Sequence, residues 1–418
     1  MNELQMYLKK TLQNLRTREG FIRIAIFLFI AGAYNLKHVA SYIFMILFFL
    51  SIYTLVRPIN KIELSKIEKY ALSFLMVYFI WFVITSLIPG WEYNQTKRLG
   101  VELRFILAIP IYILLRQVKG LLLPLWYGVT VALWLGFIVV LYQVYILNVE
   151  AAGGYGKLLL GPMSVLYIFM FLARKDWATS IKLKIFSFAT VIVGVVPVGL
   201  SGARTAYIML PALALIWVMA NYNWRKQLVL VGALTCVVLG VYFSSDTVKT
   251  GVDRAVKGGV NYSKSSSKDM SARNLGSTET RLEMMKAAYL ITIDNPIFGI
   301  GSGNLEEVSK LYIKAGLYHA DIGKFEHLHN IYADNSAKKG VPGLVLTLMM
   351  FFIPMWFFWK WKKQFYFPAA IGFYYVAGEI IAGLTIVAPI DRGNFVAISL
   401  VILSVCLSEV LDSKKRLA

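Results

Sequence analysis

Apolar stretches recur along the whole chain and are separated by short charged connections. A helix needs roughly 20 mostly apolar residues to cross about 30 Å of hydrocarbon. About twelve stretches have this character, so we expect an all-α, polytopic integral membrane protein. The stretches lie near residues 21–36, 39–56, 70–89, 100–116, 121–146, 156–173, 184–200, 204–220, 227–244, 341–359, 366–388 and 393–410.

The fourth stretch is the weakest, because only the run from Phe105 to Leu115 is free of charge. We expect Arg104 and Arg116 at its ends to snorkel, with their guanidinium groups at the membrane surfaces. The composition supports the membrane class, since 58% of the 418 residues are hydrophobic and the mean hydropathy is +0.63. An ordinary soluble domain is only about 45–50% apolar.

The basic residues collect on one side of this predicted topology. Of the 43 Lys and Arg residues, 23 fall in the termini and the connections on their side, 7 fall in the short connections of the other side, and 13 lie in residues 245–340. Cytoplasmic connections carry the positive excess, and long loops cross largely regardless of charge. We therefore expect both termini in the cytoplasm. The net charge of +20 then reflects topology, and nucleic-acid binding is not needed to explain it.

This topology divides the chain into three parts. Residues 1–244 would hold transmembrane helices 1–9, residues 245–340 a loop domain on the outer face, and residues 341–418 helices 10–12 with a cytoplasmic tail. Long loops on a rigid scaffold often carry function. The loop domain is therefore the expected place for a site.

The composition changes along the loop domain. Residues 243–278 are rich in Ser, Asn, Lys and Gly and predict a mobile linker. The next segment, TETRLEMMKAAYLITIDNP, predicts an amphipathic helix, because apolar residues stand at helical spacing: Leu282, Met285, Ala288, Tyr289 and Ile293. A glycine turn, IFGIGSGN, follows it, and then a second short helix from about residue 305 with Ser302 or Asn304 as its cap.

Two of the four histidines stand together in FEHLHNIYADNSAKKGVPGL, just before the tenth apolar stretch. Zinc sites on a helix use histidines four residues apart with a carboxylate nearby, whereas His327 and His329 are two apart and no cysteine lies in the loop. Glu326 and Asp334 leave a loose metal site open, and loop histidines without any role are the plainer alternative. We expect no metal here.

Arginines at two other turns lie on the same predicted side as these histidines. LSGARTAYI is a tight turn that places Arg204 at the membrane surface, and APIDRGNF does the same for Asp391 and Arg392. A lone boundary arginine is most often a snorkelling anchor, and Asp391 is equally well explained by a local pair with Arg392. If Arg281 and the histidines join them, however, the cluster is cationic and contains a titratable base. Such a cluster suits a lipid-linked anion such as a diphosphate.

Three motifs together resemble the signature of the O-antigen ligase family. The specific one is His-Asn, nine further residues, Gly340, two residues and Gly343. SGARTA is similar to the family's outward turn with an essential arginine, and the stretch from Arg281 through NPIFGIGSGN is similar to the segment before its glycine turn. The resemblance covers about residues 190–400. The amino-terminal half is similar only in hydropathy and number of stretches.

The resemblance implies a role for each motif residue. His329 would correspond to the catalytic histidine, and Asp391 to an acidic residue near the last outer turn. Arg204 and Arg281 would correspond to the arginines that hold a polyprenyl diphosphate. Asn330, Gly340 and Gly343 belong to the motif, and the glycines allow the chain to turn sharply into the tenth helix. His327 lies outside the signature and receives no role.

The family shares its GT-C-like fold with O-antigen polymerases and bacterial protein O-oligosaccharyltransferases. Its members join a glycan carried on undecaprenyl diphosphate to lipid A-core, at the periplasmic face of the bacterial inner membrane. This inverting transfer uses no metal or cofactor. The residue types agree, since a histidine can accept the acceptor's proton and arginines can stabilise the leaving diphosphate. Many glycosyltransferases use a metal held by Asp-x-Asp for that purpose, and this chain contains no Asp-x-Asp.

Other functions remain open at this point. A polymerase or a protein-glycosylating enzyme of the same fold is separated poorly by sequence. A flippase or transporter should show ionisable groups near mid-membrane, where Glu379 stands nearly alone and has no assigned partner. A structural membrane scaffold would tolerate replacement of the outer arginines and histidines.

Overall fold

The computed structural model describes residues 17–88, 93–154, 156–244, 246–264, 275–387, 390 and 392–417. The described residues are 81% helical and contain no strand. The long helices of the first half are α2 (Arg18–Gly32), α3 (Val39–Val56), α4 (Lys66–Leu87), α5 (Tyr93–Arg116), α6 (Leu122–Leu141), α7 (Lys157–Leu172) and α8 (Ile181–Ser201). Those that follow are α9 (Arg204–Asn221), α10 (Trp224–Ser244), α11 (Asp246–Lys264), α13 (Ser277–Asp294), α14 (Leu305–Lys314), α15 (Ile331–Trp361), α16 (Tyr366–Gly383) and α18 (Gly393–Leu417).

The predicted membrane class is confirmed. Each of the twelve apolar stretches coincides with a helix, and eight helices among the described residues are long and apolar enough to cross a membrane. These eight are α3, α4, α6 with the π-helical turn that extends it, α8, α9, α10, α15 and α18. The number of twelve spans stays a prediction.

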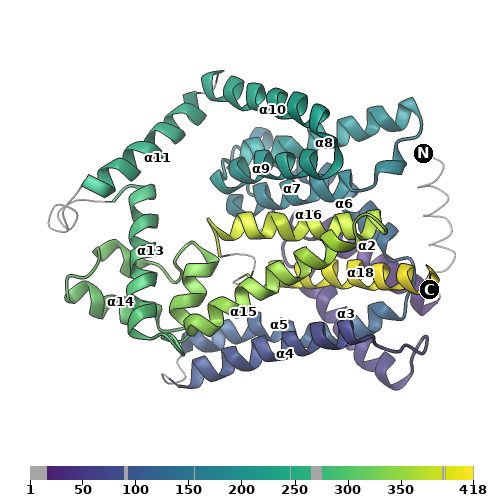
Figure 1. Cartoon of the computed structure of the whole chain (residues 1–418), viewed down its shortest axis with the longest axis horizontal. Coiled ribbons are helices and arrows are strands. Elements are labelled where there is room, and N and C mark those ends of the chain that lie inside the picture. The colour runs from purple at the N-terminus through teal and green to yellow at the C-terminus, as the bar shows by residue number, and fades with distance from the viewer. Residues whose placement is uncertain are drawn as a thin grey trace.

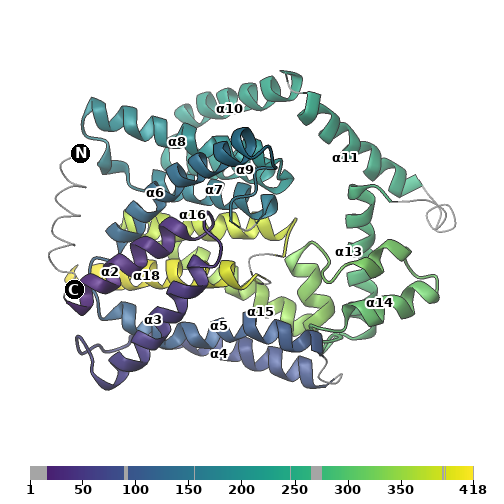
Figure 2. The ribbon, with the colours of Figure 1, turned by 180° about the vertical axis from the view of Figure 1, so that it is seen from behind.

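The helices form a bundle with a smaller helical region at one end. In both views α13 and α14 lie at one end of the bundle, and α18 ends at the other (Figures 1 and 2). We call the first the α13–α14 end. Helix α16 is central, because it packs against α7, α9, α15 and α18. Its Tyr374 and Tyr375 are fully buried.

The weak fourth stretch forms α5, but one expectation about its ends is wrong. Arg116 does not snorkel: its Nε donates to Oε1 of Glu68 at 2.7 Å, and its Nη1 donates to Asp412. All three side chains are largely buried. A buried arginine is tolerated when carboxylates satisfy its donors, so this ion-pair cluster replaces contact with the membrane surface.

The predicted helix is confirmed as α13, but its predicted amphipathic character is wrong. The residues buried in the small core of the α13–α14 end are Met284, Ala287, Ala288 and Ile291. Of the five residues expected at helical spacing, Ala288 is buried, whereas Met285, Tyr289 and Ile293 are 50%, 65% and 55% exposed. Apolar residues occupy both sides of this helix, so helical spacing alone does not indicate which side packs.

The predicted linker is also wrong in part, because residues 246–264 form α11. The helix packs on α13 and α10, and Tyr262 donates its hydroxyl proton to Oε2 of the buried Glu283 at 2.5 Å. Its valines recur at every fourth position, at 248, 252, 256 and 260. This spacing is helical, and the polar composition of the segment conceals it.

Candidate active site

The loop that carries both histidines ends at Asn330, which is the N-cap of α15. Its Oδ1 accepts hydrogen bonds from the backbone N–H groups of Tyr332 and Ala333, each at 3.0 Å. Its Nδ2 donates to the carbonyl oxygen of Leu384, in the turn after α16, at 3.2 Å. The asparagine of the motif therefore starts the helix and ties the histidine loop to α16.

His329 stands immediately before this cap with φ 51°, in the left-handed region. Its ring centroid lies 4.6 Å from that of His327 and 5.6 Å from that of Phe325. Burial first, and then the nearby charges of His327 and Arg281, lower the pKa of His329 to about 4. The imidazole is therefore neutral at physiological pH and able to accept a proton.

Asp334, a candidate ligand of the loose metal site, binds Leu328 and Lys338 instead. Its Oδ1 accepts from the backbone N–H of Leu328 at 2.9 Å, and its Oδ2 pairs with Nζ of Lys338 at 2.8 Å. The Lys338 ammonium also donates to the carbonyl oxygen of Glu326 at 2.9 Å. Asp334 and Lys338, in the first turns of α15, thus bind the backbone of the histidine loop.

The two predicted arginines come from different helices and lie near each other. Arg204 is the first residue of α9, and its Nη1 donates to Oγ of Ser277, the first residue of α13, at 3.3 Å. Arg281 lies one turn further along α13. Burial and the charge of Arg204 lower the pKa of Arg281. No described residue forms an ion pair with Arg281, so its positive charge and that of Arg204 lie near each other without a described carboxylate paired to Arg281.

The turn after α16 brings the arginines and the histidine together. Thr205, next to Arg204, and Thr385 share a hydrogen bond of 2.7 Å between their hydroxyl groups. Asn330, next to His329, binds the adjacent Leu384. Because neighbours of both predicted residues bind consecutive positions of one turn, the structure gathers Arg204, Arg281 and His329 at a single place. The charge of Arg281 accordingly acts on His329.

Gly340 interrupts α15 with φ 69° and ψ −174°, a conformation essentially restricted to glycine. The glycine turn packs directly on this kink: the N–H of Val341 donates to the carbonyl oxygen of Pro296 at 2.8 Å, and the N–H of Ile300 donates to that of Ala337 at 3.0 Å. A Cβ at position 340 would lie 2.1 Å from the carbonyl oxygen of Ile297. The motif glycine therefore allows two backbones to touch.

Replacing Gly340 by alanine is expected to destabilise the α13–α14 end. Backbone strain of this kind costs about 1–3 kcal/mol, and the clash with Ile297 adds to it. Thermal unfolding in detergent measures the loss. Gly232→Ala is the matched control, because the Cβ at this position on α10 would meet nothing within 4 Å. Equal melting temperatures for both variants would contradict the role given to Gly340.

Gly343 follows the kink and is buried, and a Cβ there would lie 2.3 Å from Cβ of Lys339. Sequence reasoning missed Lys339 itself. Its Nζ pairs with Oε1 of Glu102 at 2.6 Å and donates to the hydroxyl of Tyr78 at 3.0 Å, and all three residues are buried. In the sequence, the only indication of this ion pair is one charged residue in the apolar stretch that forms α5 and another directly before the motif glycine. This ion pair fixes the kink of α15 against α4 and α5.

Four further predicted features have different outcomes. Asp391 lies outside the described residues. Within the described part of the chain, no three His, Cys, Asp or Glu side chains gather as a metal site requires. Glu379 is buried in α16 and lines a cavity of about 40 Å³ with Tyr375 and Ser399, its nearest polar neighbours, but among the described residues neither carboxylate oxygen has a partner in full hydrogen-bonding geometry. Asn304 is the N-cap residue of α14, but its Oδ1 accepts from Nε2 of Gln95 at 3.2 Å and does not cap the helix.

Fold and site together define a polytopic membrane protein that gathers two arginines and a histidine at one end of its helix bundle. Residues 186–348, which span α8 to the first half of α15, match the family model described as O-antigen ligase. This match confirms the predicted resemblance to the O-antigen ligase family over these residues. An uncharacterized protein of Haemophilus influenzae is 21% identical over 311 residues, covering 72% of this chain and 75% of the relative.

Proposed function

We propose that this protein is an O-antigen ligase, which transfers a glycan from undecaprenyl diphosphate to lipid A-core. One observation carries the proposal: Arg204 and Arg281 lie near each other, no described residue forms an ion pair with Arg281, and a histidine held neutral lies beside them. Paired guanidinium groups suit a diphosphate, which offers several oxygens for bidentate hydrogen bonds. The family match supports a lipid-linked glycan and a membrane context in general.

The transfer would proceed as an inverting displacement. The acceptor hydroxyl attacks the anomeric carbon, and its oxygen forms the new glycosidic bond. The bond from that carbon to the diphosphate oxygen breaks, and the diphosphate leaves with the electron pair. His329 takes the proton of the hydroxyl, and Arg204 and Arg281 stabilise the charge that grows on the diphosphate.

The low pKa of His329 fits this sequence of events. A base with a pKa of about 4 is weak, and part of the shift comes from the positive charge of Arg281. A bound diphosphate would neutralise that charge and raise the pKa of His329. The base would then strengthen only when the donor is in place, which limits wasteful attack by water.

The decisive experiment is transfer by the purified protein. Undecaprenyl-diphosphate glycan and lipid A-core are mixed with the protein, with and without a chelator, and the products are sized. Ligated lipid A-core with unchanged glycan length is expected in both conditions. Elongation of the donor alone would identify a polymerase and overturn the proposal, and so would transfer to a protein acceptor only. Loss of activity with the chelator would overturn the metal-independent mechanism.

We further propose that the protein resides in the bacterial inner membrane with the α13–α14 end in the periplasm and both termini in the cytoplasm. The charge distribution supports this orientation, since basic residues are concentrated at the opposite end of the predicted topology. Cysteines introduced at Lys310 and Lys363, in a variant without Cys236 and Cys406, test it with a membrane-impermeant thiol reagent. Labelling at position 310 only is expected in intact spheroplasts, and the reverse pattern would refute the orientation.

A further inference from the structure

A cavity of about 420 Å³ opens at the end of the bundle where α18 finishes, opposite the α13–α14 end (Figure 1). Its lining comes from four parts of the chain: the turn between α5 and α6 with the start of α6, the segment after α7, the first turn of α16 and the last turns of α18. Three of the lining side chains are basic, namely Lys119, Arg174 and Arg416, and one is acidic, Glu409. The cavity therefore carries a net positive charge.

Glu409 is committed to the backbone of the turn between α5 and α6. Its Oε1 accepts a hydrogen bond from the N–H of Leu121 at 2.9 Å. Nη2 of Arg23 donates to the carbonyl oxygen of Lys119, in the same turn, at 3.1 Å. The first bond holds the turn that carries Lys119 against α18, which carries Arg416. The carboxylate thus brings two of the basic residues together, and the three cations still outnumber it.

Arg174 is held by aromatic rings. Its guanidinium carbon lies 4.9 Å from the ring centroid of Trp126, 5.5 Å from that of Trp177 and 5.8 Å from that of Phe367. Cation–π contacts engage the face of a guanidinium group, whereas its N–H donors lie in its plane. The guanidinium is therefore fixed in place, and a fixed planar fork suits the oxygens of a phosphate.

Apolar side chains complete the lining. Leu123 on α6 and Phe367 on α16 both line the cavity and are partly exposed. A soluble anion would match only the basic residues, and an uncharged lipid would match only the apolar ones. An anionic phospholipid matches both. In the proposed orientation this end faces the cytoplasm, where basic pockets between transmembrane helices typically bind such head groups.

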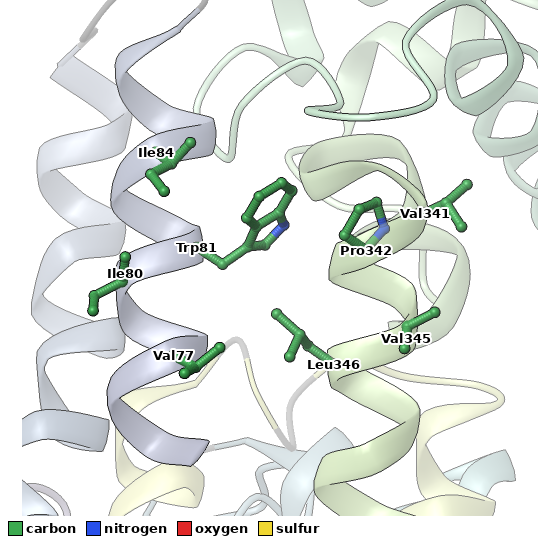
Figure 3. A pocket seen from close by; sticks show the side chains of 8 residues that line it. All are labelled: Val77, Ile80, Trp81, Ile84, Val341, Pro342, Val345 and Leu346. Atoms are coloured by element: carbon green, nitrogen blue, oxygen red, sulfur yellow. The ribbon is translucent and has the colours of Figure 1, made fainter. Parts of the chain in front are cut away.

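The groove between α4 and α15 is of similar size but has a different lining. Its volume is about 490 Å³, and none of the described side chains that line it is charged. Figure 3 shows Trp81 pointing from α4 toward Pro342 on α15, with Val345 further along α15. Such a surface can contact lipid chains but offers nothing to a charged head group. It therefore serves as the control site.

We propose that the cavity at the α18 end binds an anionic phospholipid, with its phosphate beside Lys119, Arg174 and Arg416 and an acyl chain against Leu123 and Phe367. The ligand would join the ends of α7, α16 and α18. This site does not depend on the proposed ligase function, because it lies at the opposite end of the bundle from the candidate active site.

Binding of phosphatidylglycerol to the purified protein in detergent, titrated by native mass spectrometry, tests the charge requirement. Lys119→Gln combined with Arg416→Gln is expected to weaken binding about 30-fold, or about fivefold for each basic residue removed. Lys363→Gln combined with Lys415→Gln is the matched control, because it removes the same charge from exposed positions at the same end, outside the cavity. This control should change the affinity little.

Two further ligands identify the source of the phosphate. Phosphatidylethanolamine with the same acyl chains has no net charge, and glycerol phosphate has the charge without the chains. Both are expected to bind much more weakly than phosphatidylglycerol. Equal affinity for either would overturn the proposal, in favour of a lipid without head-group preference or of a soluble phosphate. Equal weakening in both double variants would also overturn it, because binding would then follow only the overall charge of this end.

Photo-crosslinking tests the place of binding in variants that keep every charge. A photoreactive amino acid at Leu123, in vesicles of equal parts phosphatidylglycerol and phosphatidylethanolamine, is expected to give adducts enriched in phosphatidylglycerol. The same amino acid at Val345, which is 47% exposed in the groove between α4 and α15, should give adducts in the proportion of the vesicle. Equal proportions at the two positions would contradict a lipid site at the α18 end.

Discussion

His329→Ala is expected to lower the rate of glycosyl transfer by about 10²- to 10⁴-fold, the usual contribution of a general base. The substitution removes the group that would accept the acceptor's proton, but leaves both arginines in place. Donor affinity should therefore remain near the wild-type value, since a base acts in the transition state more than in binding. Ligated product per minute and donor binding, measured on the same preparation, separate these two effects.

His327→Ala is the matched control, because it removes the same imidazole from the same loop. The two rings lie 4.6 Å apart, so both substitutions act on the same part of the loop. His327→Ala should retain substantial activity. Equal loss in both variants, together with inhibition of the wild type by a chelator, would favour a shared metal over a single base.

The pH dependence provides a second measure of the same group. The acidic limb of kcat/KM for the donor reports the free enzyme and should lie near the pKa of about 4 that burial, His327 and Arg281 give His329. The acidic limb of kcat reports the loaded enzyme, in which the diphosphate offsets the arginine charges. That limb should therefore lie at higher pH. Coincident limbs would contradict the proposed strengthening of the base by the donor.

Much of the fold follows from one strong signal in the sequence, the recurrence of long apolar runs. Roughly 20-residue apolar runs have few solutions other than membrane helices, and every predicted run is a helix. Local signals were also sufficient where the cause is local: Asn330 caps α15, and Gly340 adopts a backbone conformation that other residues avoid. Such features depend on a few neighbouring residues.

Features that depend on distant partners were not predictable in the same way. Lys339 and Glu102 are separated by more than half of the chain, and their ion pair exists only because α5 and α15 meet. The ion pairs of Arg116 with Glu68 and Asp412 likewise depend on residues distant in the sequence. From the sequence alone, an arginine at the end of a helix is interpreted as a snorkelling anchor. The buried side of α13 was likewise decided by its neighbours.

Arg281→Ala is expected to lower kcat by about 10²- to 10³-fold, the loss typical of one preorganised donor to a developing negative charge. Arg281 is half-buried and has no ion-pair partner among the described residues. Burial and the charge of Arg204 lower its pKa, and its own charge adds to the effect of burial and His327 in lowering the pKa of His329. No described carboxylate is thus paired with the charge of Arg281, which is available to a diphosphate. Lysine at this position should rescue poorly, because an ammonium lacks the planar fork that binds two phosphate oxygens.

Stability measurements distinguish this role from a structural one. Burial and the neighbouring charge of Arg204 both disfavour the ionised Arg281, so alanine at position 281 removes a buried, repelled charge and should leave the melting temperature unchanged or slightly higher. Arg254→Ala on α11 removes the same charge from an exposed position and should retain full activity. A fully active Arg281→Ala enzyme at saturating donor would refute the diphosphate role. A large drop in the melting temperature would also refute it, because it would show that Arg281 stabilises the fold, whereas a residue kept for diphosphate binding should not.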